Sequence, residues 1–317
     1  MSLGSKDSSI KQELDRLQKR RPRLQARASL IQAIRDFFVD RDYLEVETPL
    51  LIPAPAPEMH IDAISAGHSY LHTSPELCMK RLLSAGYSKI FQISKCFRSG
   101  ERGDLHLPEF TLLEWYRTGW DYMALMEECE ELFLFVTNRL GIGDRLQYQG
   151  KVIELQRPWR RISLREAFDR YASISVGEAI ENGCFDEVMA KDIEPHLGIP
   201  RPTFVYDYPS CFAALARLRS DRPEVAERCE IYMAGVELAN AFSELTNVGE
   251  QRARFDRDRQ VRKDLGKPVY PVPERFLSSL EHMPEAAGIA LGVDRLAMIL
   301  TDSARVEDVL AFAPEEL

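Results

Sequence analysis

The chain has 317 residues and a formal net charge of −9, from 41 basic and 50 acidic side chains. Its length suits one large domain or two ordinary ones, and its acidic balance argues against bulk binding of DNA or RNA. It has no apolar run long enough for a membrane span and no signal peptide. The six cysteines stand singly, without a CxxC pair. We therefore expect reduced thiols, no zinc site and a cytoplasmic protein without membrane contact.

The first third of the chain predicts an extension, a helix and a strand. Residues 1–20 are polar and predict a frayed tail or a short exposed helix, and residues 1–30 carry a local charge of +5. This basic run is either the solvated face of a helix or an arm that binds a partner. Apolar residues recur at helical spacing from Leu24 to Phe38, which predicts an amphipathic helix. YLEVETP predicts a short strand that ends at Pro49.

The next segment predicts a loop, a helix, a hairpin and a second helix. The prolines of LIPAPAPEMH predict the loop. SPELCMKRLLSAG predicts a helix with Ser74 as N-cap, Pro75 at the first position and Glu76 in the first turn. KIFQISKCFR and EFTLLEWYR alternate like strands, and the polar GERGDLH between them predicts a hairpin loop. Residues 121–140 predict another long helix.

The remaining residues predict an insertion and the end of a sheet. Residues 144–225 predict short helices and loops, with TFVYDYP as a strand. CEIYMAGVELANAF predicts one or two strands, residues 249–266 predict a charged helix, and AAGIALGVDRLAMIL predicts a strand that runs into a helix. Strands that pair through hairpins between long excursions favour a mostly antiparallel sheet flanked by helices, an α+β fold.

Two segments combine apolar strands with groups that bind phosphates or bases. In FRSGERGDLHLPEF, Arg98 would clamp a phosphate, His106 would add a donor and Phe110 would stack on a base. A surface hairpin with a salt bridge explains the same residues. In GIALGVDRLAMIL, Gly292 would let a ligand approach the backbone, and Arg295 would contact phosphate or adenine. Pairing of that arginine with a neighbouring acid is the alternative.

A third segment, GVELANAFSEL, concentrates carboxylates. Glu237, Asn240 and Glu244 stand three and seven positions apart, which is the spacing of a solvated helix face. The alternative is a carboxylate cluster that holds Mg²⁺ or an ammonium group, with Glu230 as a further member.

Together and in this order, the region of Pro49, FRSGERGDLHLPEF and GIALGVDRL resemble the three motifs of class II aminoacyl-tRNA synthetases. TSPELCMKRLL, LPEFTLLEWY and VELANAFSEL are similar to the lysyl-tRNA synthetase catalytic core. LLEWYR, ELTNVGEQ and GVDRL resemble its freestanding paralogue, the elongation factor P–lysine ligase family, with a likeness over about residues 24–313. The resemblance implies a class II synthetase-like catalytic domain over residues 21–317, without an anticodon-binding domain.

The resemblance also implies roles for individual residues. Arg98 and Arg295 would be catalytic, Glu76 would face the α-amino end of the amino acid, and Glu114, Tyr116 and Glu244 would hold its far amino group. The implied ATP-binding residues are Arg98, Gly100, Glu101, His106, Phe110, Glu237, Leu238, Asn240, Gly292 and Arg295; the amino-acid-binding residues are Ser74, Pro75, Glu76, Glu114, Tyr116, Ala239 and Glu244; and the Mg²⁺ ligands are Glu230 and Glu237.

Three differences from the synthetases bear on these roles. Ala239 stands where lysyl-tRNA synthetases have Gly, a feature that the resemblance associates with β-lysine. Gly100 interrupts the usual F-R-N-E, and leucines replace an Arg and an Asn of the R-H-N-P-E-F pattern. Either Glu101 and Arg102 supply the lost ATP contacts or ATP binding is weaker.

The function implied by the resemblance is that of a homodimeric ligase. It would use ATP and Mg²⁺ to activate lysine or (R)-β-lysine as an adenylate, and would transfer it to a lysine of elongation factor P; tRNA is not expected as a partner. One alternative is a truncated synthetase-like core that acts on tRNA or a small acceptor. Another is a catalytically decayed protein that senses lysine or ATP.

Overall fold

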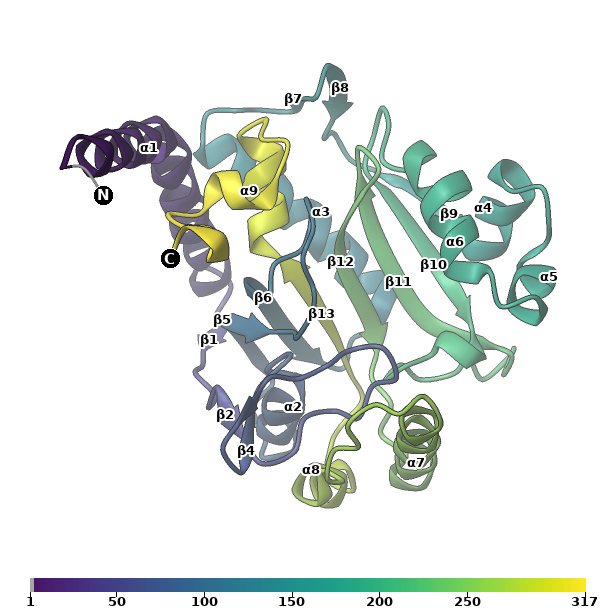
Figure 1. Ribbon diagram of the computed structural model, residues 1–317. Coiled ribbons are helices and arrows are strands. Elements are labelled where there is room, and N and C mark those ends of the chain that lie inside the picture. The colour runs from purple at the N-terminus through teal and green to yellow at the C-terminus, as the bar shows by residue number, and fades with distance from the viewer. Residues whose placement is uncertain (1–2) are drawn as a thin grey trace.

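An eight-stranded sheet forms the centre of the computed structural model, which describes residues 3–317 (Figure 1). In spatial order its strands are β1 (Leu44–Glu45), β5 (Lys89–Phe97), β6 (Glu109–Thr118), β13 (Ala286–Gly292), β12 (Val236–Ser243), β11 (Val225–Met233), β10 (Thr203–Pro209) and β9 (Arg160–Ser163). The two edge strands, β1 and β9, pair in parallel with their neighbours, and the pairs between them are antiparallel. The predicted α+β class with a mostly antiparallel sheet is therefore confirmed.

Helices pack on both faces of this sheet (Figure 1). One face is covered by α1 (Leu3–Val39), α3 (Tyr122–Arg139) and α9 (Val293–Leu300), which share the largest apolar core with the sheet. The other carries α2 (Glu76–Ser84), α7 (Val248–Asp264) and α8 (Glu274–Leu280). A third apolar cluster lies under α4 (Leu164–Tyr171), α5 (Val176–Glu181) and α6 (Phe185–Val188), beside β9 and β10. Within residues 3–317, no helix has both the length and the apolar character of a membrane span.

Two smaller sheets complete the fold. One joins β2 (Leu51–Ile52), β4 (Ser69–Leu71) and β3 (Ser65–Ala66), so the predicted proline-rich loop begins only after β2. The other is the hairpin of β7 (Arg145–Tyr148) and β8 (Lys151–Glu154). The short helices predicted within residues 144–225 are present as α4–α6. The strand predicted for TFVYDYP is present as β10, but β7, β8 and β9 were not predicted, because strands of four residues are too short to show a clear alternation.

The first helix is longer than its apolar pattern predicts. It begins at Leu3 and contains Pro22, so from residue 3 onward the expected tail belongs to this helix; residues 1–2 lie outside the described part of the chain. Arg20 is buried and donates to the Glu316 carboxylate at 2.6 and 2.9 Å, and Arg16 pairs with the same carboxylate. These tertiary ion pairs, which a local pattern cannot reveal, hold the polar turns of the helix against the C-terminal segment.

Alternation along β6 determines which side chains face each side of the sheet. Leu113 and Trp115 are fully buried in the core beneath α1 and α3. Leu112, Glu114 and Tyr116 point to the opposite face, because successive side chains of a strand alternate. The strand therefore presents a carboxylate and a phenol side by side.

Candidate active site

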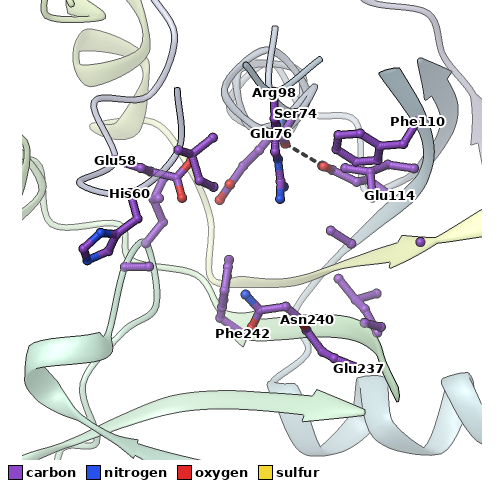
Figure 2. Close-up of a pocket in the computed structure, with 18 of the residues that line it drawn as sticks. Glu58, His60, Ser74, Glu76, Arg98, Phe110, Glu114, Glu237, Asn240 and Phe242 are labelled. Carbon is purple, nitrogen blue, oxygen red and sulfur yellow. Dashed lines mark hydrogen bonds between the residues drawn. The ribbon is translucent and has the colours of Figure 1, made fainter. Parts of the chain in front are cut away.

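A cleft of about 530 Å³ opens on the sheet face opposite α1 and α3 (Figure 2). Strands β6, β12 and β13 form its floor, and the start of α2, the β2–β3 loop, the β5–β6 loop and α7 form its walls. It brings together most of the residues singled out in the sequence: Ser74, Glu76, Arg98, Glu101, His106, Phe110, Glu114, Tyr116, Glu237, Leu238, Ala239, Asn240, Gly292 and Arg295. Pro75, Gly100, Glu230 and Glu244 do not line it.

One end of the cleft carries two guanidinium groups. The Arg98 guanidinium lies 4.9 Å from the centre of the Phe110 ring and 3.7 Å from the Glu101 carboxylate. The Arg98 side chain is 26% exposed and lines the cleft, so its guanidinium can donate to a ligand oxygen. Arg295 donates from Nη1 to the Glu237 backbone oxygen at 2.7 Å, and its Nη2 lies 2.7 Å from Nε2 of His106. Burial and the nearby Arg295 lower the pKa of His106, which favours a neutral ring that accepts this hydrogen bond.

The β5–β6 loop explains the departures from the synthetase motif. Gly100 has φ of +78°, a conformation that glycine adopts without strain. Glu101 lines the cleft, whereas Arg102 turns to the C-terminal segment and pairs with Glu307 at 2.7 Å and Glu315 at 2.6 Å. This pairing does not favour the alternative in which Arg102 supplies a lost ATP contact.

A hydrogen-bonded chain connects α1 to this end of the cleft. Nη2 of Arg27 donates to the Asp294 carboxylate at 2.8 Å and to the Thr111 hydroxyl at 2.9 Å. The second Asp294 oxygen accepts from the Thr111 backbone N–H at 2.7 Å. Asp294 precedes Arg295, and Thr111 follows Phe110. Arg27 therefore helps to hold the start of β6, which carries Phe110, beside the start of α9, which carries Arg295. These two side chains are the ones expected to contact adenine.

The opposite end of the cleft is acidic. Glu114, which is 1% exposed, accepts from the Ser74 hydroxyl at 2.6 Å and from the Tyr116 hydroxyl at 2.9 Å (Figure 2). Burial, with a contribution from Glu76, raises the pKa of Glu114 to about 8. Ser74 also accepts from the Glu76 backbone N–H at 3.0 Å, although Pro75 takes the N-cap position expected for Ser74. These contacts arrange acceptors for a ligand ammonium group.

Lys80 is a buried cation that the sequence patterns did not single out. Its Nζ lies 2.5 Å from the Glu76 carboxylate, contacts the Glu244 carboxylate and lies 5.7 Å from the centre of the Phe242 ring. Burial alone would lower the pKa of Lys80, but Glu244 and Glu76 raise it, so the amine stays charged. Glu244 does not line the cleft itself, and its contact with the site is through Lys80. The sequence offered one signal for this role, because Lys80 is a charged residue among the otherwise apolar buried residues of α2.

Gly288 is a second site residue that was missed. A Cβ at this position would lie 2.2 Å from the Tyr116 ring and 2.4 Å from Oε1 of Glu244, so only glycine leaves room for both side chains. A glycine within an apolar strand is a sign of such a close approach.

The expected metal ligands differ in their availability. Glu230 accepts from Tyr208 at 2.5 Å, from Tyr232 at 2.7 Å and from Arg228 at 2.6 Å, which leaves its carboxylate fully engaged. Glu237 lines the cleft floor with its side chain 37% exposed, and only one of its carboxylate oxygens is engaged within the described part of the chain, by Arg295 at 3.3 Å. The side chains described by the structure, those of residues 10, 11 and 13–317, include no group of three or more His, Cys, Asp or Glu that could hold a metal ion. Glu237 fits Mg²⁺ shared with substrate phosphates, the usual arrangement for this ion, and Glu230 does not.

Comparisons with known proteins identify the family of the chain. The family model of class II tRNA synthetases (D, K and N) matches residues 11–316. Similar relatives named elongation factor P–(R)-β-lysine ligase occur in Proteus mirabilis (40% identical, over 90% of this chain and 93% of the relative), Vibrio cholerae (39%, over 91% and 94%) and Pectobacterium carotovorum (41%, over 91% and 94%). The chain belongs to the elongation factor P–(R)-β-lysine ligase family, within the class II tRNA synthetases. This membership confirms the predicted family and places the chain among ATP-dependent ligases.

Proposed function

We propose that this protein activates lysine or (R)-β-lysine with ATP and transfers it to a lysine of elongation factor P. The observation that supports this choice of substrate is the charge at the acidic end of the cleft. The carboxylates of Glu76, Glu114 and Glu244, with Lys80 among them, have a formal charge of −2 when all are ionised. The two ammonium groups of lysine or β-lysine neutralise this charge, whereas a neutral amino acid would leave buried carboxylates unpaired, at a high cost.

The other end of the cleft suits ATP. The Arg98 guanidinium would donate to the α-phosphate, and the Phe110 ring and the Arg295 guanidinium offer planar surfaces for adenine. Gly292 and Asn240 line the space between them. Bound by Glu237 and the phosphates, Mg²⁺ would neutralise part of the triphosphate charge.

In the first step, a carboxylate oxygen of the amino acid would attack the α-phosphorus, and the bond to pyrophosphate would break. Arg98 and Arg295 would stabilise the negative charge that develops on the phosphate oxygens. No protein nucleophile is required, because the cleft holds the two reactants in place. In the second step, the ε-amino nitrogen of the acceptor lysine would attack the adenylate carbonyl, and AMP would leave.

The acceptor and the assembly are further parts of this proposal. The names of the relatives support elongation factor P as acceptor, with tRNA not expected, and a translation factor as acceptor favours the cytoplasm. A homodimer through α1 and β1 is supported by the exposed apolar side chains of Val39, Leu44, Leu50 and Leu51. Burial of these apolar side chains when two copies of the chain associate is favourable.

The departures in motif 2 do not favour a decayed sensor. Gly100 adopts a left-handed backbone conformation that favours glycine. Leu107 is buried in the main core, and Leu105 packs against that core. These three residues therefore have structural reasons to differ from the synthetase pattern.

ATP–pyrophosphate exchange tests the activation step. Exchange is expected with lysine or (R)-β-lysine and not with norleucine, which lacks the distal amine. Glu114→Gln, which keeps the size of the side chain, should reduce exchange with the diamino acids. Exchange with norleucine at a similar rate, or none with either diamino acid, would contradict the proposal.

A further inference from the structure

Glu58 is a carboxylate at the mouth of the cleft that has no role in the steps above. It lies on the proline-rich loop between β2 and β3, and its carboxylate points into the cleft toward Glu76, with Arg98 close by (Figure 2). Among the side chains that the structure describes (residues 10, 11 and 13–317), none donates a hydrogen bond to its carboxylate oxygens, whereas Glu76 is held by Lys80. Glu58 is therefore free to interact with a ligand that enters the cleft.

The backbone of this loop is fixed by one buried side chain. Arg262 is fully buried, and it donates from Nη1 to the backbone oxygens of Glu58 at 2.8 Å and Ile61 at 3.0 Å. Its Nη2 donates to the Asp62 carboxylate at 2.6 Å, and its guanidinium lies 4.3 Å from the centre of the Tyr270 ring. This anchoring holds Glu58 at the cleft mouth, as a proton acceptor requires.

Four charged groups from different elements face Glu58. They are Glu76 at the start of α2, Arg98 after β5, Arg228 on β11 and Asp258 on α7. Burial, with the repulsion of Glu76 next in size, raises the pKa of Glu58 to about 7. A carboxylate with a pKa near the working pH is an efficient general base, because it is partly ionised and still basic enough to take a proton.

The transfer step needs such a base. The acceptor lysine arrives as an ammonium ion, and with a pKa of about 10.4 only about one molecule in a thousand is a free amine near neutral pH. Of the four neighbouring groups, Arg98 and Arg228 are cations and Glu76 is paired with Lys80. Asp258 is the other carboxylate at this position, and the substitution Asp258→Asn tests it separately.

We propose that Glu58 is the general base of the transfer step, an inference that rests on the proposed function. Its carboxylate takes one proton from the acceptor ammonium group, and the freed electron pair forms the bond to the adenylate carbonyl carbon. The bond from that carbon to the AMP oxygen breaks, and the second proton on nitrogen passes to water. Glu58 then loses its proton to solvent.

Single-turnover transfer from preformed adenylate tests this role with Glu58→Gln. Transfer to elongation factor P should fall about 10²- to 10⁴-fold, while ATP–pyrophosphate exchange stays within about twofold of the unmodified protein. Hydroxylamine, a nucleophile that is already neutral at this pH, should trap the adenylate at an unchanged rate. The transfer rate of the unmodified protein should rise with pH and level off above about 7, whereas that of Glu58→Gln should keep rising, because it depends on the free-amine fraction of the acceptor. Asp258→Asn, which removes a neighbouring carboxylate, is the matched control and should retain transfer.

Two results would overturn the role of Glu58. An equal loss of exchange would show that Glu58 binds the amino acid or ATP, and unchanged transfer would show that it takes no proton. Failure of the proposed function itself is a separate result, since the unmodified protein would then show no exchange or no transfer.

Discussion

Lowering the pH from 8 to 6 should weaken the binding of lysine, because Glu114 must lose its proton before it can hold an ammonium group. Burial and the nearby Glu76 raise the pKa of Glu114 to about 8 in the free protein. With that pKa, about half of the carboxyl groups are ionised at pH 8 and about 1% at pH 6, so the Kd for lysine should rise about fifty-fold. The ammonium groups of lysine remain charged over most of this range. Because the pKa of Glu114 is raised in the free protein, most of its carboxyl groups are protonated below pH 8. Lysine binding requires the ionised carboxylate, so binding releases a proton.

Titration calorimetry in buffers of different ionisation enthalpy counts that proton directly. At pH 7, about 0.9 protons should leave Glu114 for each lysine bound. Glu114→Gln keeps the side-chain size but cannot ionise, so proton release should fall by about one and the Kd should depend less on pH. Equal proton release by the two proteins would refute the reasoning.

Three other substitutions test separate parts of the site. Gly288→Ala places a methyl group against Tyr116 and should lower kcat/KM for lysine about tenfold or more in exchange assays, with KM for ATP little changed; an equal effect on both substrates would contradict this. Glu230→Gln should lower Tm without shifting the Mg²⁺ concentration required, whereas Glu237→Gln should raise that concentration; a shift with Glu230→Gln would restore its expected metal role. Arg27→Met should raise KM for ATP more than Arg27→Lys does, and a lower Tm with KM unchanged would leave Arg27 a purely structural role.

Local patterns predict the parts of the fold that local forces determine. The alternation of KIFQISKCFR and EFTLLEWYR predicts β5 and β6, which pair from Lys89 with Arg117 to Phe97 with Glu109. The strand that runs into a helix at Gly292 is likewise present as β13 and α9. In each of these cases the signal and the structure that it predicts lie within the same few residues.

The missed features depend on contacts between distant segments. Lys80 acquires its role only when β12 brings Glu244 beside α2, and Glu230 is engaged because β10 carries Tyr208 next to it. The turns of α1 around Arg16 and Arg20, which precede the apolar pattern, pair with Glu316 of the C-terminal segment. Spacing within one segment contains no information on such partners.

Mass spectrometry of elongation factor P after incubation with this protein, ATP and (R)-β-lysine tests the proposed ligase activity most directly. Elongation factor P should gain the mass of one lysyl group on a lysine side chain, and omission of ATP or the substitution Glu114→Gln should reduce the modified fraction. A tRNA pool incubated in parallel should remain uncharged. Charging of tRNA with no modification of elongation factor P would contradict the proposed acceptor.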